Sequence, residues 1–185
     1  GQPKTIDLFS YIEFCLWNAQ DDAANFQRNW NIGEVEVEGS VIYHKTEYRE
    51  RRNHYAFFSC SESLVGFDTS RDVFLGNMNE YSCPDAVRAR KAANSMASGW
   101  SPIGSHQVRL TLEPGQTKTL HFVLGYMENP DDQKFSSPGR LNKERSVVLL
   151  DSLRTAAQVD EKRQALRRFW DETLSAMQAD PGEPV

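Results

Sequence analysis

The sequence predicts a mainly β protein: a partial antiparallel β-sandwich followed by C-terminal linker helices. Three observations carry this prediction. Eighteen of the 20 aromatic residues precede residue 140. Several segments before that point alternate apolar and polar residues with a period of two, as strands with one solvated face do. Between Arg140 and Asp180 there is no glycine and no proline, which indicates that short, turn-linked elements give way to long helices.

Six segments carry the strand pattern. Residues 6–17 are apolar on both alternating faces, as in a strand that is covered on both sides. Residues 34–38 alternate glutamate with valine, which predicts one wet face. Gly39 and Ser40 then suit a two-residue hairpin turn with a positive φ at the glycine. The other predicted strands are residues 41–47, 54–61, 108–112 and 120–124.

Helical patterns dominate the end of the chain. Residues 142–153 form one predicted helix, and residues 85–97 are consistent with an earlier, shorter one. Thr155 and Gln158 fit a capping box at the start of the last helix, which Pro181 and Gly182 end. Apolar residues recur along that helix as a single stripe, which needs a covering surface on the sandwich or in a helical domain beyond residue 185. The stripe consists of Val159, Leu166, Trp170, Thr173 and Met177.

The chain of 185 residues is long enough for one domain with a sizeable core. We expect a partial sandwich domain at residues 1–140, linker helices at 141–180 and a tail at 181–185. The sequence lacks an initiator methionine and runs at once into a strand pattern, so it resembles a piece of a longer protein. A sandwich without its early strands should expose apolar residues such as Phe9, Tyr11 and Phe14, or cover them with another copy.

Composition narrows the functional classes. A net charge of −5 disfavours general nucleic-acid binding. The longest aliphatic run is residues 147–150, whereas a membrane-spanning helix needs about 20 apolar residues. The three cysteines, Cys15, Cys60 and Cys83, are expected to be buried, reduced thiols in a cytoplasmic protein.

Residues 18–33 form the most informative segment, a long loop between two predicted strands. Amide side chains both donate and accept hydrogen bonds, as sugar hydroxyls do, and arginine adds a rigid fork of donors. Aromatic rings can cover the apolar face of a sugar. The alternative is an asparagine-rich loop whose amides satisfy only its own backbone. The polar residues are Asn18, Gln20, Asn25, Gln27, Arg28, Asn29 and Asn31, interleaved with Phe26 and Trp30.

A second charged segment spans residues 45–52. Its charges can pair across strands, or its arginines can contact a phosphate or a sugar. Glu47 and Glu50 interrupt the positive run and disfavour a nucleic-acid patch.

Other chemistries find little support. His44, His54, His106 and His121 lack any local metal-ligand spacing and are expected to be surface or hydrogen-bonded structural residues. The adjacent Asp21 and Asp22 cannot bracket a glycosidic bond as a hydrolytic pair must. The sequence contains no nucleophile elbow, phosphate-binding loop or dinucleotide fingerprint.

A long ordered run resembles the amino-terminal region of cellobiose phosphorylases, which are inverting disaccharide phosphorylases. It reads FSYIEFCLWNAQDDAANFQRNWNIGEVEVEGSVIYHKTEYRERRNHYAFF, and the later segments GFDTSRDVFLG, ASGWSPIGSH and LEPGQTKTLHFVLGYMENP agree with it. The resemblance extends from about residue 4 to residue 177. It implies the later part of an N-terminal β-sandwich and the start of a helical linker that leads to a missing (α/α)6 barrel.

The resemblance also implies an activity. Cellobiose and phosphate would be converted to α-glucose 1-phosphate and glucose, with inversion and without a metal or an organic cofactor. The partners would be the disaccharide, inorganic phosphate and a second copy in a homodimer. The general acid and the main phosphate-binding residues would lie on the barrel, so this segment should contain no catalytic residue and be inactive alone. Alternatives are a related phosphorylase of cellodextrin, laminaribiose or chitobiose, a non-catalytic carbohydrate-binding sandwich, or a structural dimerisation domain.

The same resemblance assigns sugar-binding residues to the loop. The WNA…NFQR stretch reaches the acceptor-sugar subsite in that family, and its positions here are Asn18, Asn25, Gln27 and Arg28. Gln27 and Arg28 would bind acceptor hydroxyls, and Asn18 and Asn25 would shape the loop or line the entrance. Residues 77–94 follow the family only loosely, and no site is expected there.

Overall fold

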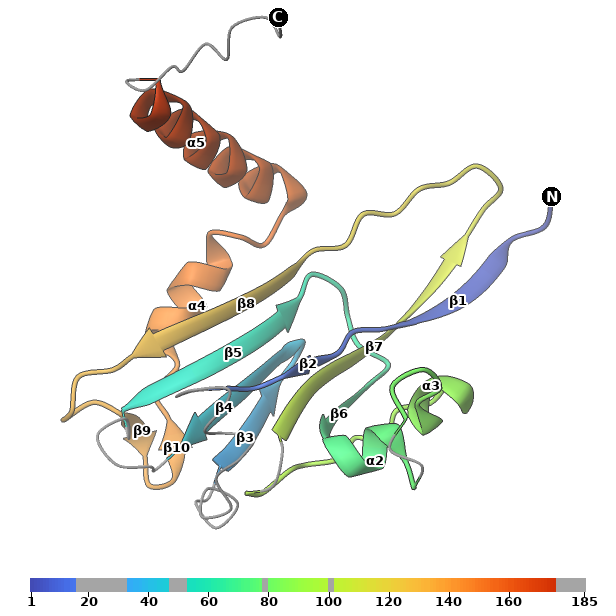
Figure 1. Ribbon diagram of the computed structural model, residues 1–185, viewed down its shortest axis with the longest axis horizontal. Coiled ribbons are helices and arrows are strands. Elements are labelled where there is room, and N and C mark those ends of the chain that lie inside the picture. The colour runs from blue at the N-terminus through green and yellow to red at the C-terminus, as the bar shows by residue number, and fades with distance from the viewer. Residues whose placement is uncertain (16–32, 47–52, 78–79, 100–101, 176–185) are drawn as a thin grey trace, which may run out of the picture.

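The structure is a computed structural model that describes residues 1–15, 33–46, 53–77, 80–99 and 102–175. Two antiparallel four-stranded sheets face each other, and each carries further elements on its outer side (Figure 1). The predicted β-sandwich followed by helices is therefore confirmed.

Strand β7 (Pro102–Leu112) is the centre of the first sheet. β1 (Lys4–Phe9) and β2 (Ile12–Glu13) pair in succession with one of its edges, and β6 (Gly66–Ser70) pairs with the other. The prediction of one continuous strand over residues 6–17 is therefore wrong. Ser10 interrupts it, because the Ser10 side-chain oxygen accepts a hydrogen bond from the His106 backbone N–H at 2.9 Å and contacts His106 Nδ1 at 3.0 Å.

The second sheet has the order β3 (Gly33–Glu38), β4 (Val41–Thr46), β5 (His54–Cys60) and β8 (Phe122–Glu128). These strands confirm the predicted segments at 34–38, 41–47 and 54–61, and β8 begins inside the segment predicted at 120–124. The hairpin between β3 and β4 turns at Gly39, whose φ of +58° matches the prediction for this turn.

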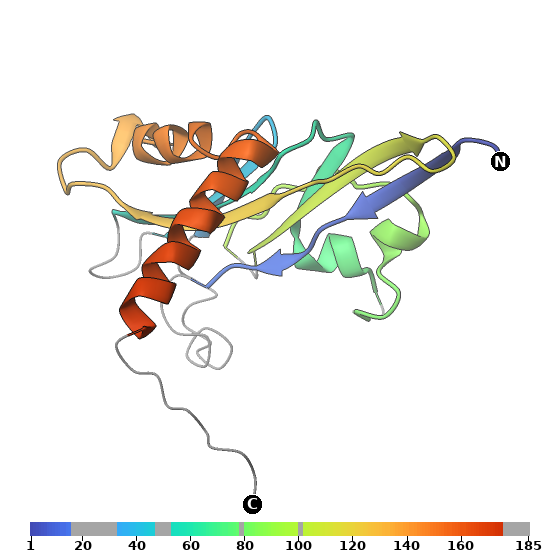
Figure 2. The ribbon, with the colours of Figure 1, turned by 90° about the horizontal axis from the view of Figure 1, so that it is seen from above.

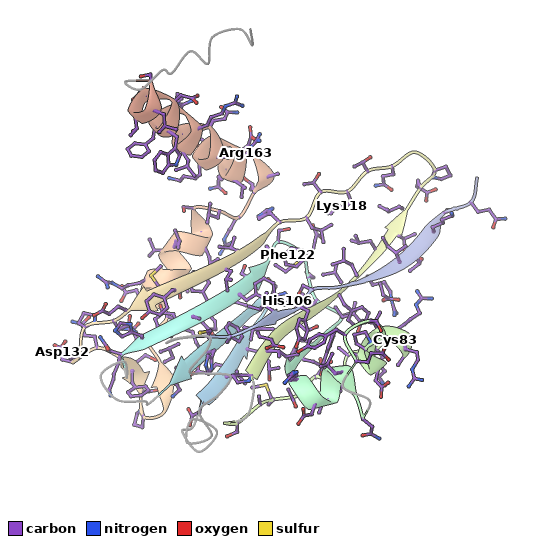
Figure 3. All side chains as sticks on the ribbon, viewed as in Figure 1. Cys83, His106, Lys118, Phe122, Asp132 and Arg163 are labelled. Carbon is purple, nitrogen blue, oxygen red and sulfur yellow. The ribbon has the colours of Figure 1, made fainter. Side chains whose placement is uncertain are left out.

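Aromatic side chains and histidines fill the space between the sheets. The His106 ring of β7 lies 4.6 Å from the Phe58 ring of β5, and Phe122 of β8 stacks on Phe58 at 5.8 Å (Figure 3). His44 is likewise buried, with its ring 5.3 Å from that of Phe14. Burial disfavours the charged imidazolium and lowers the pKa of both His44 and His106 to about 4. Both are neutral core residues, as the expectation of structural histidines requires.

The outer face of the second sheet is covered by the hairpin of β9 (Phe135–Ser137) and β10 (Arg140–Leu141) and by α4 (Glu144–Asp151). Tyr43, Tyr55, Phe57 and Leu141 form the core there. Gly125 of β8 lies against the Phe57 ring, and any added Cβ would overlap that ring. The close approach explains a glycine in the middle of this strand.

The outer face of the first sheet is covered by α2 (Arg71–Leu75) and α3 (Asp85–Arg88). Figure 2 shows these green helices and the orange α4 on opposite sides of the sheets. The helix expected over residues 85–97 ends at Arg88, because Arg90 and Asn94 adopt positive φ angles that a right-handed helix cannot contain. α2, β6 and the β9–β10 hairpin were not predicted.

Lys143 joins α4 to the edge strand β3. Its side chain is 7% exposed; Nζ contacts Glu36 and lies 2.6 Å from Glu38 Oε1 and 5.0 Å from the Tyr43 ring centre. The Leu141 backbone N–H also donates to Glu36 at 2.9 Å. The glutamate face of β3, predicted to be wet, is therefore partly covered.

Helix α5 (Ala156–Leu174) begins at the predicted capping box: the Gln158 backbone N–H donates to the Thr155 hydroxyl at 3.2 Å, and the Thr155 N–H donates to the Gln158 side chain at 3.0 Å. No residue of α5 is buried, and Figure 1 shows it standing apart from the sheets. Its stripe residues Leu166 and Trp170 are 58% and 50% exposed, so no described residue covers them.

Exposure elsewhere differs in part from the expectations. Phe9, Tyr11 and Phe14 are half-buried, and Phe9 and Tyr11 pack against the core under α2 and α3. Apolar side chains with a larger exposed fraction include Leu124 of β8, which is 62% exposed. Cys60 is buried as expected, but Cys15 and Cys83 are exposed, because they lie at the end of a strand and in a turn rather than in the core. Over the described ranges, no helix is both long and apolar enough to cross a membrane.

We predict that Lys143→Met lowers the free energy of unfolding by about 2 kcal/mol, because it leaves the partly buried Glu36 without its cation and Glu38 with Arg140 alone. Arg140→Met is the matched control, since Arg140 also contacts Glu38 but is 64% exposed and should matter less. Urea denaturation at pH 7 measures both. Equal losses of unfolding free energy in the two variants would show that the burial of Lys143 contributes nothing to stability.

We predict that the chain loses stability as the pH falls from about 6.5 to 4. In that window the unfolded histidines bind protons and the folded His44 and His106 do not, so each lowers the free energy of unfolding by up to roughly 3 kcal/mol. Denaturation curves across this range test the effect. His106→Gln cannot be protonated and should give a flatter dependence on pH; curves parallel to those of the parent chain would contradict the assignment.

Candidate functional site

The four predicted sugar-binding residues, Asn18, Asn25, Gln27 and Arg28, lie outside the described residues. The structure does describe both ends of the segment that carries them. One end is the strand β2 with Phe14 and Cys15, and the other is the start of β3 at Gly33 and Glu34. We call these two ends the anchors of the segment.

Glu13 of β2 is the centre of the first anchor. Its Oε1 accepts hydrogen bonds from the hydroxyls of Tyr11, at 2.8 Å, and Tyr81, at 2.7 Å. Arg71 of α2 donates to the Tyr81 hydroxyl at 2.7 Å and has its Nε 3.5 Å from Glu13 Oε1. Burial opposes ionisation of Glu13, but the two tyrosine hydrogen bonds and the charge of Arg71 outweigh it and lower the pKa of this carboxyl. Glu13 is thus held as a carboxylate that ties β2 to α2.

Lys45 of β4 is the centre of the second anchor. Its Nζ lies 2.7 Å from Glu34 Oε2, donates to the Gly139 carbonyl at 3.2 Å and lies 4.7 Å from the Phe135 ring centre. The Lys45 side chain is 7% exposed. The β3–β4 hairpin and the β9–β10 hairpin, which are distant in sequence, therefore meet at the start of β3.

The two anchors are neighbours. Phe14 packs on His44, and the His44 ring nitrogen Nδ1 lies 3.4 Å from the Glu34 carbonyl oxygen. The Phe14 backbone N–H donates to the Pro102 carbonyl at 3.2 Å. The described residues that flank the segment at 16–32 thus lie at adjacent points of the two sheets and are held there by these contacts.

The charged segment at residues 45–52 is described only at its beginning, since residues 47–52 lie outside the described part. Lys45 is bound to Glu34 and to a carbonyl, which favours the ion-pair interpretation for this residue over a ligand contact.

Sequence reasoning missed the Glu13 network. Tyr81 lies in a stretch without periodicity, and its contact with Glu13 joins residues that are 68 positions apart. No local signal marks such a pair. The two anchor carboxylates, Glu13 and Glu34, are each engaged by donors and act as structural joints. Among the described side chains, no group of three or more His, Cys, Asp or Glu residues is placed to hold a metal ion.

Comparison with known proteins gives the family. Residues 1–146 match the model of the glycosyl hydrolase 94 supersandwich domain. The chain is 25% identical over 178 residues, 96% of its length, to an N,N′-diacetylchitobiose phosphorylase from Vibrio proteolyticus, of which it covers 20%. It is 23% identical over 157 residues, 80% of its length, to a solabiose phosphorylase from Paenibacillus borealis, of which it again covers 20%.

The chain therefore spans about a fifth of the length of these relatives. The family match includes both sheets and both anchors of the segment at residues 16–32. This chain belongs to the glycosyl hydrolase 94 family and contains its supersandwich domain.

Proposed function

We propose that this chain is the sandwich portion of an inverting disaccharide phosphorylase that converts cellobiose and phosphate to α-glucose 1-phosphate and glucose. The family match over residues 1–146 carries the proposal, supported by relatives that are named as phosphorylases of diacetylchitobiose and solabiose. The whole enzyme would be a cytoplasmic homodimer that uses no cofactor.

Within that enzyme, the segment would supply part of the acceptor-sugar site. Arg28 would donate to acceptor hydroxyls, and Gln27 would both donate to and accept from them, while Asn18 and Asn25 would shape the loop or line its entrance. The rigid anchors at Glu13 and Lys45 support this role, because a binding loop gains affinity when its ends are already ordered. The described carboxylates at the anchors are engaged in ion pairs and hydrogen bonds, which agrees with a general acid supplied from outside this chain.

N,N′-Diacetylchitobiose is the second candidate substrate. It is favoured by the match to the Vibrio proteolyticus enzyme, which extends over 96% of this chain. The choice between the two disaccharides depends on the residues that recognise the substituent at the 2-position of the sugar.

We predict that the full-length protein releases a sugar 1-phosphate from a disaccharide and inorganic phosphate, whereas the 185-residue chain does not. Parallel assays with cellobiose and with N,N′-diacetylchitobiose separate the substrates, since the products are glucose 1-phosphate and N-acetylglucosamine 1-phosphate. Product from neither disaccharide, together with tight binding of cellobiose, would indicate a non-catalytic binding sandwich instead.

We predict that Arg28→Ala in the full-length protein lowers kcat/KM for the acceptor sugar, in the synthetic direction, at least tenfold, or about 1.4 kcal/mol. The loss follows from removing a charged donor from sugar hydroxyls. Arg154→Ala is the control, because Arg154 is 73% exposed and pairs only with the nearby Asp151 among the described residues. Unchanged acceptor kinetics for Arg28→Ala would assign the loop a purely structural role, as in a dimerisation domain.

A further inference from the structure

A surface cavity of about 630 Å³ lies on the outer side of the first sheet. β1 and β7 form its floor, and the residues that follow α3 form one wall. Three cationic side chains line it, namely Arg90, Lys91 and Arg109, together with the polar Thr5 and Gln107.

A buried carboxylate organises two of these cations. The Asp7 side chain is 2% exposed; its Oδ1 accepts from Arg109 Nε at 2.7 Å, and its Oδ2 accepts from Arg90 Nε at 2.9 Å. Gln107 donates to Asp7 Oδ1 at 3.1 Å. The hydrogen bond from Arg109, helped by those from Arg90 and Gln107, outweighs burial and lowers the pKa of Asp7 to about 2. The carboxylate therefore stays ionised and holds both guanidinium groups in place.

The backbone of the wall is also held in place. Arg90 has a φ of +52°, a conformation that is costly for a side chain of this size. The Gln107 side chain donates to the Arg90 carbonyl at 2.9 Å and accepts from the Ala92 N–H at 2.8 Å. Strained backbone persists only where its surroundings over-determine it, and such positions cluster at ligand sites.

The cavity carries an excess of positive charge on an acidic chain. Three cations stand against one carboxylate here, whereas the chain as a whole has a net charge of −5. Arg109 contacts Asp7 through Nε, and its terminal nitrogens make no hydrogen bond within the described part of the chain. Lys91 likewise has no ion pair with any residue that the structure describes. The guanidinium groups of Arg109 and Arg90, which Asp7 holds in a fixed direction, match the oxygens of a phosphate group, and Lys91 adds a third positive charge.

We propose that this cavity binds a phosphate group, carried either by inorganic phosphate or by a sugar phosphate. Arg109, Arg90 and Lys91 contact the phosphate oxygens, and Thr5 lines the same cavity and could be reached by a sugar hydroxyl. Arg109 lies seven residues along β7 from Pro102, which contacts Phe14 of the first anchor, or about 24 Å at the usual rise of a strand. The proposal does not depend on the proposed enzymatic activity.

Hydrogen–deuterium exchange of the full-length protein tests this site locally. We expect sodium phosphate, and separately glucose 1-phosphate, to slow exchange in peptides covering residues 86–93 and 105–112. Lys91→Gln and Arg109→Gln should each raise the concentration needed for half-maximal protection about tenfold. Arg88→Gln is the control, since Arg88 pairs with Asp85 on α3 and does not line the cavity. Lys91→Gln also controls for misfolding, because this exposed side chain forms no ion pair with any described residue.

Equal protection by both compounds would assign the site to the phosphate group alone, and stronger protection by glucose 1-phosphate would add contacts to the sugar. Protection that sodium chloride reproduces at the same ionic strength would overturn the proposal, as would protection that neither Lys91→Gln nor Arg109→Gln weakens. A phosphorylase that turns over normally but shows no protection at these peptides would refute this site while leaving the proposed function intact.

Discussion

Strand β7 must satisfy hydrogen bonds on both edges and bury side chains on both faces, and the rest of the fold is arranged around this constraint. β1 and β2 share one edge, and β6 takes the other. On one face Ile103 joins the core beneath α2 and α3. On the opposite face His106 packs against Phe58 of the second sheet. A strand covered in this way cannot move without disturbing three layers, so it fixes the positions of the elements that pair with it or pack on it.

Carboxylates act as joints between the layers. Asp7 binds arginines from β7 and from the segment after α3, Glu13 binds Tyr81 of the loop before α3 and lies near Arg71 of α2, and Glu38 binds Arg140 and Lys143. In each case the partners are distant in sequence. Such pairs contribute little stability at an exposed surface, but they select one arrangement of the segments when they are partly buried. These acidic side chains thus contribute to the architecture of the chain.

The two anchors of residues 16–32 are products of this arrangement. Glu13 and Lys45 hold the ends of a polar and aromatic segment at adjacent points of the two sheets. A loop with ordered ends loses less conformational entropy when it binds a small polar molecule. The cationic cavity near Asp7 is lined in part by β7, the same strand that pairs with β2 and so positions Glu13.

The sequence by itself determined the elements with strong periodicity: β3, β4, β5, the turn at Gly39 and the capping box of α5. These depend on neighbours along the chain, which periodicity and turn chemistry report directly. It also predicted a sugar-binding loop with Asn18, Asn25, Gln27 and Arg28, and these four positions lie outside the described residues. Tertiary structure alone decided the break at Ser10, the burial of Lys143 and the meeting of Glu13 with Tyr81 and of Asp7 with Arg90. Each of these contacts joins residues far apart in sequence, and local patterns carry no information about such pairs because the contact forms only after the sheets have packed.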